Sequence, residues 1–263
     1  MIELHEGDCI EVIEELHKKG VKVNGVITSP PYNTARNGSN FSNHEARYIS
    51  HNDNMPQQEY IDWQVDLFNK MESILEKDGC ILYNISYGAE NTDTLWLLIA
   101  DIIRNTNLVT ADHLIWKKKT ALPNNSNHNR VTRITENVFV FCRKSELGTF
   151  KMNKKVSSVS HTGQKFYENI YNFVEAGNND LGEHTKKHKA TYSMDLVEQL
   201  IKLYYEEESV ILDPYMGTGT TGLACKKLNR SFIGIELENE YFKISEDRLS
   251  DMVYRDDLFE EDD

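Results

Sequence analysis

The feature that most constrains this chain is a glycine-rich turn between an apolar run and a helical pattern. The turn spans Asp213–Gly222, follows the apolar run Val210–Leu212 and opens a helix that begins near Thr220. Its glycines at 217, 219 and 222 have the G-x-G-x-x-G spacing of a dinucleotide-binding turn. In such a turn the backbone approaches the ligand closely and helix N-terminal amides point at it. The spacing therefore predicts a ligand at the end of a strand in an α/β sheet.

An acidic residue completes this unit. Glu236 follows the next apolar run, Phe232–Ile235, and a carboxylate there can accept hydrogen bonds from ribose hydroxyls. A lone glycine pattern is weakly diagnostic. Strand, glycine turn, helix, strand and terminal acid in this order favour a nucleoside-containing cofactor over a purely structural turn.

Short apolar runs alternate with helical patterns along the rest of the chain, which predicts an α/β sheet with helices on both faces. The expected strands are Ile2–His5, Gly25–Thr28, Cys80–Ile85, His113–Trp116, Asn137–Phe141, Ser209–Leu212 and Phe232–Ile235. The expected helices are Cys9–Lys18, Gln58–Leu75, Thr92–Arg104, Met194–Tyr205, Thr220–Lys227 and Asn239–Leu249. Residues 33–56, 117–133 and 144–191 lack periodicity, and irregular segments this long are usually functional.

Charge is distributed unevenly along the chain, whose net charge is −13. Residues 113–192 hold 14 basic and six acidic side chains, whereas the remainder holds 15 basic and 36 acidic ones. This asymmetry is typical of a phosphate-binding segment on an acidic body, although a solvated loop region accounts for the charge alone equally well. Residues 256–263 are mostly acidic and are expected to form a frayed tail.

Several classes of protein are excluded by what the sequence lacks. The longest apolar run, Leu95–Ile99, is too short to span a bilayer, and the acidic first residues are unlike a signal peptide. Four scattered cysteines predict reduced thiols in a cytoplasmic protein. Because neither the cysteines nor the histidines have paired spacing, we expect no metal, and we expect no membrane partner.

A second motif lies at the end of another expected strand. Thr28–Asn33 contains Ser29, two consecutive prolines and Tyr32. The prolines fix φ and extend the residue before them, so this segment is expected to project rigidly from the strand end. A small polar side chain, a proline carbonyl and an aromatic ring could grip a planar amine there, although a simple Pro-Pro turn is the commoner structure.

Together the two motifs resemble those of the amino-group DNA methyltransferases that use S-adenosylmethionine. Their order, with Ser29–Tyr32 first and the glycine turn near the C-terminus, is similar to the permuted β class of that family. The resemblance covers nearly the whole chain, although Tyr215 stands where the family usually has Phe, and Lys189 and Ser193 stand where it has Pro. It implies a circularly permuted, Rossmann-like methyltransferase sheet of seven strands, with an irregular basic insertion that recognises DNA.

The resemblance also implies roles for individual residues. The catalytic residues would be Ser29, Pro30, Pro31 and Tyr32. The cofactor would contact Asp8, Asp213, Pro214, Tyr215, Gly217, Gly219, Thr220, Thr221 and Glu236. Phosphate contacts are expected from Lys117, Lys118, Lys119, Arg130 and Arg133.

Three parts of one domain follow from this assignment. Residues 1–116 would form the catalytic half, residues 117–192 the last sheet strand near 137–142 with the target-recognition segments, and residues 193–255 the cofactor half. Double-stranded DNA is the expected partner. A homodimer and a companion restriction enzyme stay open.

The acceptor base is left open between cytosine N4 and adenine N6. In the resembling family, Ser at position 29 accompanies cytosine N4 more often than adenine N6, so cytosine is favoured. Two further alternatives are an NAD-dependent oxidoreductase, which would normally place the glycine turn in its first βαβ unit, and a catalytically silent DNA-binding protein. C5-cytosine chemistry is disfavoured because it needs a thiolate nucleophile, and no Cys follows a Pro in this sequence.

Overall fold

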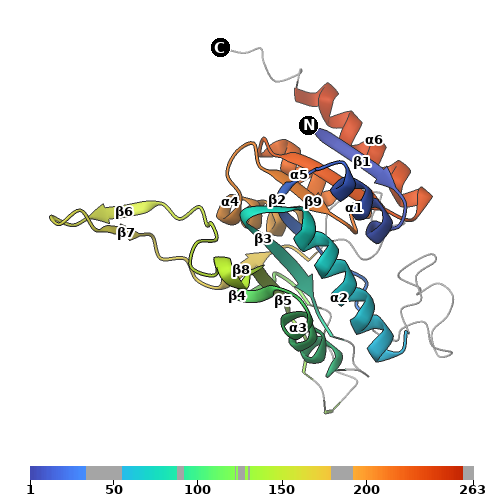
Figure 1. The fold of residues 1–263 in the computed structure, drawn as a ribbon, viewed down its shortest axis with the longest axis horizontal. Coiled ribbons are helices and arrows are strands. Elements are labelled where there is room, and N and C mark those ends of the chain that lie inside the picture. The colour runs from blue at the N-terminus through green and yellow to red at the C-terminus, as the bar shows by residue number, and fades with distance from the viewer. Residues whose placement is uncertain are drawn as a thin grey trace.

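The computed structural model describes residues 1–33, 55–87, 92–121, 123, 128–129, 131–178 and 192–256, with the backbone alone from 251 to 256. Eight strands form one mixed sheet in the order β1-β10-β9-β2-β3-β5-β4-β8 (Figure 1). Their bounds are β1 Ile2–Glu6, β2 Val23–Thr28, β3 Leu75–Ile85, β4 Leu108–Lys118, β5 Thr135–Arg143, β8 Phe173–Ala176, β9 Val210–Asp213 and β10 Ser231–Glu236.

The strand directions place the carboxyl ends of five neighbours at one edge. β1, β10, β9, β2 and β3 are mutually parallel, whereas β5 runs antiparallel to both β3 and β4. Consequently the beginning of β5 lies at the same edge as the ends of β2 and β3. β8 pairs parallel with β4 and closes that side of the sheet.

Three helices cover each face of the sheet. Helices α1 (Cys9–Lys18), α2 (Gln57–Ile74) and α3 (Thr94–Asn105) pack in one buried cluster with strand residues such as Ile81. Helices α4 (Met194–Tyr204), α5 (Thr220–Lys227) and α6 (Asn239–Asp256) pack in a second cluster with residues such as Leu82. Consecutive strand residues thus face opposite clusters, as the two-residue period of a strand requires.

Tyr205, directly after α4, connects this helix with strands β2 and β3 at the centre of the sheet. Its buried hydroxyl donates toward the carbonyl oxygens of Val26 and Cys80, both 3.0 Å away. A β-carbon at position 25 would lie 2.0 Å from the Tyr205 ring. Gly25 is therefore the residue that lets this ring lie against β2.

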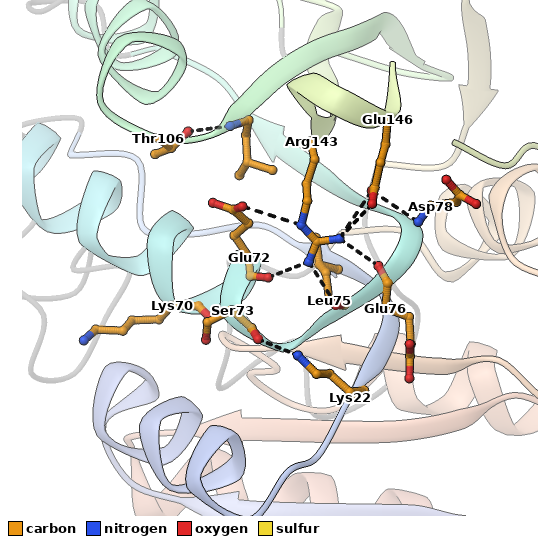
Figure 2. Close-up of polar contacts among 11 residues, drawn as sticks. Lys22, Lys70, Glu72, Ser73, Leu75, Glu76, Asp78, Thr106, Arg143 and Glu146 are labelled. Carbon is orange, nitrogen blue, oxygen red and sulfur yellow. Dashed lines mark hydrogen bonds and ion pairs between the residues drawn. The ribbon is translucent and has the colours of Figure 1, made fainter. Parts of the chain in front are cut away.

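At the sheet edge away from the two motifs, three cations cap helix ends. Arg143, at the end of β5, donates to the carbonyls of Glu72, Leu75 and Glu76 at 2.9–3.0 Å and pairs with Glu146 (Figure 2). Lys144 donates to the carbonyl of Ile103, in the last turn of α3, and to that of Thr106, directly after the helix. Lys22 donates to a carbonyl in the last turn of α2. Since helix ends leave carbonyls unpaired, these cations serve the fold.

All seven expected strands and all six expected helices are present, with shifts at their ends. The sheet, however, has eight strands rather than seven, because Phe173–Ala176 adds the edge strand β8. Inside the segment expected to be irregular, β6 (Val156–Val159) and β7 (Lys165–Tyr167) form a hairpin that projects from the body (Figure 1). These strands are three or four residues long, too short to give a readable period.

Candidate active site

The glycine turn has the backbone geometry that its spacing predicts. Gly217 and Gly219 have φ of 54° and 83°, a left-handed conformation that side chains rarely adopt. Gly222 lies inside α5, and a β-carbon there would come within 2.8 Å of the Phe232 ring on β10. The first two glycines therefore shape the turn, and the third allows close packing of helix on strand.

Asp213, at the end of β9, holds the turn together from inside. Its carboxylate accepts hydrogen bonds from Thr28 at 2.8 Å, Thr221 at 2.5 Å, Tyr192 at 3.1 Å and the Tyr215 amide at 3.1 Å. Burial raises the pKa of Asp213, and these hydrogen bonds oppose the rise by favouring the charged form. The side chain is 1% exposed, so it stabilises the turn and its neighbours.

Glu236, at the end of β10, presents a partly buried carboxylate beside the turn. One oxygen accepts the Gly217 amide at 2.9 Å and the other accepts the Glu238 amide at 2.8 Å. Burial raises the pKa of Glu236 to about 7, although both amides favour ionisation. A carboxylate has about four lone-pair positions, so two remain in which ribose hydroxyls could be accepted.

The other residues expected to contact the cofactor gather at the same edge. Asp8 follows β1 and caps α1 by accepting the Ile10 amide at 2.9 Å, and Gly7 donates to the Glu236 carbonyl at 2.9 Å. Pro214 and Thr220 are buried in the turn, and Tyr215 accepts from Gln64 at 3.2 Å. Four consecutive loops at the ends of β1, β10, β9 and β2 thus meet. This arrangement fits a nucleoside-containing cofactor.

The second motif adjoins the first because β2 pairs with β9. The 2.8 Å hydrogen bond from Thr28 to Asp213 connects residues 185 positions apart. Beyond Thr28, the Pro31 carbonyl accepts from Tyr60 at 2.7 Å. Tyr60 belongs to α2. It is fully buried and fastens the proline-rich loop to α2.

Tyr32 lies at the centre of a polar cluster. Its hydroxyl is 2.9 Å from Ser29 Oγ, 3.1 Å from Asn84 Oδ1 and 3.0 Å from Glu136 Oε2. Glu136 in turn pairs with Lys118, with Oε1 and Nζ 2.6 Å apart. Asn84 and Glu136 were missed by sequence reasoning. Both lie near the sheet edge that carries the two motifs. Their position there can be recognised only once the strand directions are known.

The basic residues expected to contact DNA have intramolecular partners. Lys117 pairs with Glu175 at 2.7 Å, Lys118 with Glu136 at 2.6 Å and Lys119 with Asp195 at 3.6 Å. Arg133 donates to the Tyr87 carbonyl and lies 4.3 Å from the centroid of its ring. Arg130 lies outside the described residues.

The described part of the chain holds neither a metal-binding cluster nor a membrane-spanning helix. Among those residues, no group of three His, Cys, Asp or Glu side chains could hold a metal ion. No helix among them is both long and apolar enough to cross a membrane.

Comparison with known proteins identifies the class. A family model described as DNA methylase, of the N6 and N4 type, matches residues 23–247. The chain therefore belongs to the DNA methylase family, and it is an S-adenosylmethionine-dependent DNA methyltransferase that modifies an amino group. This membership sets aside the oxidoreductase and the silent DNA-binding protein.

Individual relatives agree with this placement. Type II methyltransferase M.BglII of Bacillus subtilis is 23% identical over 94% of this chain and 68% of its own length. The crystal structure of the M1.HpyAVI complex with S-adenosylmethionine superposes with a TM-score of 0.67 at 25% identity, over 95% of this chain and 99% of that one. The cytosine-N4-specific PvuII DNA methyltransferase has the same fold, with a TM-score of 0.67 at 19% identity over 97% and 92% of the two chains.

Proposed function

We propose that this enzyme methylates the exocyclic amine of a base flipped out of double-stranded DNA, and that the base is cytosine. The observation that carries the proposal is the hydrogen bond from Thr28 to Asp213, which joins the proline-rich loop to the glycine turn. A base at the loop and a cofactor at the turn would lie side by side. A base inside a duplex cannot reach a buried methyl donor, so it must be extruded.

The cofactor side of the site uses residues from three strand ends. Glu236 would accept the ribose hydroxyls with its remaining lone pairs, Asp8 would lie near the adenine, and the amides at Gly217 and Gly219 would border the methionine end. Asp213, whose oxygens already accept four hydrogen bonds, supports this end by holding the turn. When bound, S-adenosylmethionine supplies an electrophilic methyl group on a sulfonium.

The base side of the site positions the amine. Ser29 Oγ and the Pro30 carbonyl would accept its two hydrogens, and the Tyr32 ring would stack on the base. Holding two reactants in line in this way can lower a barrier by about 7 kcal/mol or more in the best cases. Pro31 contributes by fixing the loop against Tyr60.

Cytosine N4 is favoured because Ser29 is short and neutral. An Asp or Asn at this position would extend farther toward the amine, so residue 29 helps to define the space around it. The adenine N6 product is the alternative outcome of the same chemistry.

DNA contact is proposed for the segment between Lys117 and Tyr192, which includes the projecting hairpin. Lys155, directly before β6, and Lys165, at the start of β7, are both exposed on this hairpin. Lys119, whose side chain is 60% exposed, is the member of the lysine run most accessible to phosphate.

A permuted chain order and a reducing compartment complete the proposal. Among the described strands β1 comes first and β10 last in sequence, and their parallel pairing supports a circularly permuted order. The four cysteines are free and buried, which suits a protein of the reducing cytoplasm. The type II relatives suggest that this enzyme belongs to a type II restriction–modification system.

Mass spectrometry of nucleosides from DNA methylated in vitro tests the base and the atom together. We expect N4-methylcytosine, and N6-methyladenine alone would overturn the base assignment. Ser29→Ala should cut turnover strongly while cofactor affinity stays near normal. Tyr32→Ala should also lose capture of the flipped base, because stacking contributes roughly 1–3 kcal/mol per base. Full activity in both variants would refute the mechanism.

A further inference from the structure

A chain of hydrogen bonds runs from the proline-rich loop to an ion pair on the neighbouring strands. Ser29 Oγ is 2.9 Å from the Tyr32 hydroxyl, and that hydroxyl is 3.0 Å from Glu136 Oε2. The other oxygen of Glu136 accepts from Lys118 at 2.6 Å. The Glu136 and Lys118 side chains are 14% and 24% exposed. The chain is therefore largely shielded from water.

The Lys118–Glu136 ion pair determines which groups donate and which accept along these hydrogen bonds. Lys118 can only donate and an ionised Glu136 can only accept, so the Tyr32 hydroxyl must donate to Glu136. Its oxygen then accepts the proton of Ser29. Asn84 reinforces this direction, because its amide nitrogen donates to the Asn137 carbonyl at 3.1 Å and its oxygen, which can only accept, faces the Tyr32 hydroxyl. The single Tyr32 proton is shared between the Glu136 and Asn84 oxygens, which leaves the Tyr32 oxygen to accept from Ser29.

This direction matters for methyl transfer. A serine whose proton points at Tyr32 offers its lone pairs to a hydrogen of the target amine. A serine turned the other way would donate toward the amine nitrogen and occupy the lone pair that must attack the methyl group.

We propose that Glu136, held by Lys118, is a positioning residue that makes Ser29 a hydrogen-bond acceptor for the target amine. It acts through the Tyr32 hydroxyl. This inference rests on the proposed role of Ser29.

Two substitutions break the chain at different links. In Glu136→Gln, Lys118 attracts the amide oxygen, so the amide nitrogen faces Tyr32 and donates to it. Tyr32→Phe removes the hydroxyl and keeps the ring. We expect each to lower the single-turnover methylation rate about tenfold or more, as expected for loss of a hydrogen bond to a charged group. The KM for DNA and the Kd for S-adenosylmethionine should stay within about twofold, since neither ligand is bound by the lost group.

The double variant separates this role from a merely structural one. If Glu136 acts through Tyr32, then Glu136→Gln should slow the Tyr32→Phe enzyme less than twofold, whereas independent effects would multiply. Lys118→Met removes the cation that holds Glu136. It should therefore also lower the methylation rate of the parent enzyme but slow the Tyr32→Phe enzyme less than twofold. Glu198→Gln is the matched control, because Glu198 is 14% exposed, as Glu136 is, and its pair with Lys227, 2.8 Å long, does not contact Tyr32.

The outcomes distinguish this inference from the proposed function. Full activity of Ser29→Ala would refute the role of Ser29 itself. A slow Ser29→Ala beside a normal Glu136→Gln would overturn only the inference, and so would multiplicative effects in the double variant. If Glu136→Gln loses cofactor affinity, Lys118→Met takes its place in the comparison with Tyr32→Phe. Multiplicative effects of Lys118→Met and Tyr32→Phe would then overturn the inference.

Discussion

Glu236→Gln is expected to stabilise the protein without cofactor while weakening cofactor binding. Burial raises the pKa of Glu236 to about 7 from an ordinary value of 4.5. At 1.36 kcal/mol per pH unit, the ionised carboxylate costs the folded state about 3 kcal/mol at alkaline pH. Glutamine removes this cost and can keep the bond from the Gly217 amide. Its own N–H group then faces the Glu238 amide, which costs about 1 kcal/mol.

The net gain of about 2 kcal/mol should depend on pH in a defined direction. Because the folded-state pKa of Glu236 lies above its ordinary value, this destabilisation is absent below pH 4.5 and complete above pH 7. At pH 5.5 roughly 1.4 kcal/mol of it remains, so the variant and the parent should then be nearly equal. Thermal unfolding without cofactor at pH 8.5 should give the variant a Tm about 4–8 °C higher. A lower Tm at pH 8.5, or a difference that does not change with pH, would refute the reasoning.

The ionised Glu236 carboxylate, which destabilises the folded protein, should strengthen cofactor binding. If the ribose hydroxyls are accepted by the ionised Glu236, the Kd of the parent enzyme should rise about tenfold for each pH unit below 7. The glutamine variant should bind more weakly at pH 8 and lose this pH dependence. Calorimetry between pH 5.5 and 8.5 measures both, and a Kd for the parent that is constant over this range would contradict the ribose role.

Two further predictions concern the basic residues of the hairpin and of the sheet edge. Lys155→Gln with Lys165→Gln should reduce the slope of log affinity for DNA against log salt by about 1.8, since each lost phosphate contact lowers it by about 0.9. Lys19→Gln is the exposed control, and an unchanged slope would place the DNA face elsewhere. Arg143→Met should lower the free energy of unfolding in urea by about 2–4 kcal/mol, because three carbonyls near the end of α2 lose their donor (Figure 2). Arg104→Met at an exposed pair is its control, and a loss below about 0.5 kcal/mol would contradict the capping role.

The strands and helices that carry the two motifs could be predicted because their signals are local. The turn at Asp213–Gly222 combines glycine spacing with the apolar runs on either side, and the structure contains both strands and the helix. Glu136 could not be found this way. Glu136 lies near the start of β5, whereas the general rule expects ligands at the carboxyl ends of strands, so the rule does not indicate this residue. Only the antiparallel direction of β5 brings it to Tyr32.

The local excess of positive charge was a poorer guide to individual residues. Residues 113–192 differ from the rest of the chain in charge, but a net charge does not show which cations have partners. Arg143 and Lys144 cap helices at the far edge of the sheet, and Lys118 holds Glu136. A lysine beside a glutamate on a neighbouring strand cannot be recognised before the strand register is known.

The meeting of the two motifs follows from the sheet order and is independent of the order in which the chain visits them. From β9 the sheet continues through β10 and β1 on one side, and through β2 and β3 on the other. The junction of β9 and β2 is therefore the point where successive connections diverge, and ligands of open α/β sheets bind at such a point. Thr28 and Asp213 end these two strands and are joined across the junction by a buried hydrogen bond of 2.8 Å. The order of β2 and β9 in the sequence does not affect this pairing, because the two strands contact each other directly and the chain connection between them can be placed elsewhere. The geometry that would bring a base beside a methyl donor in the proposed mechanism is thus a property of one strand pair.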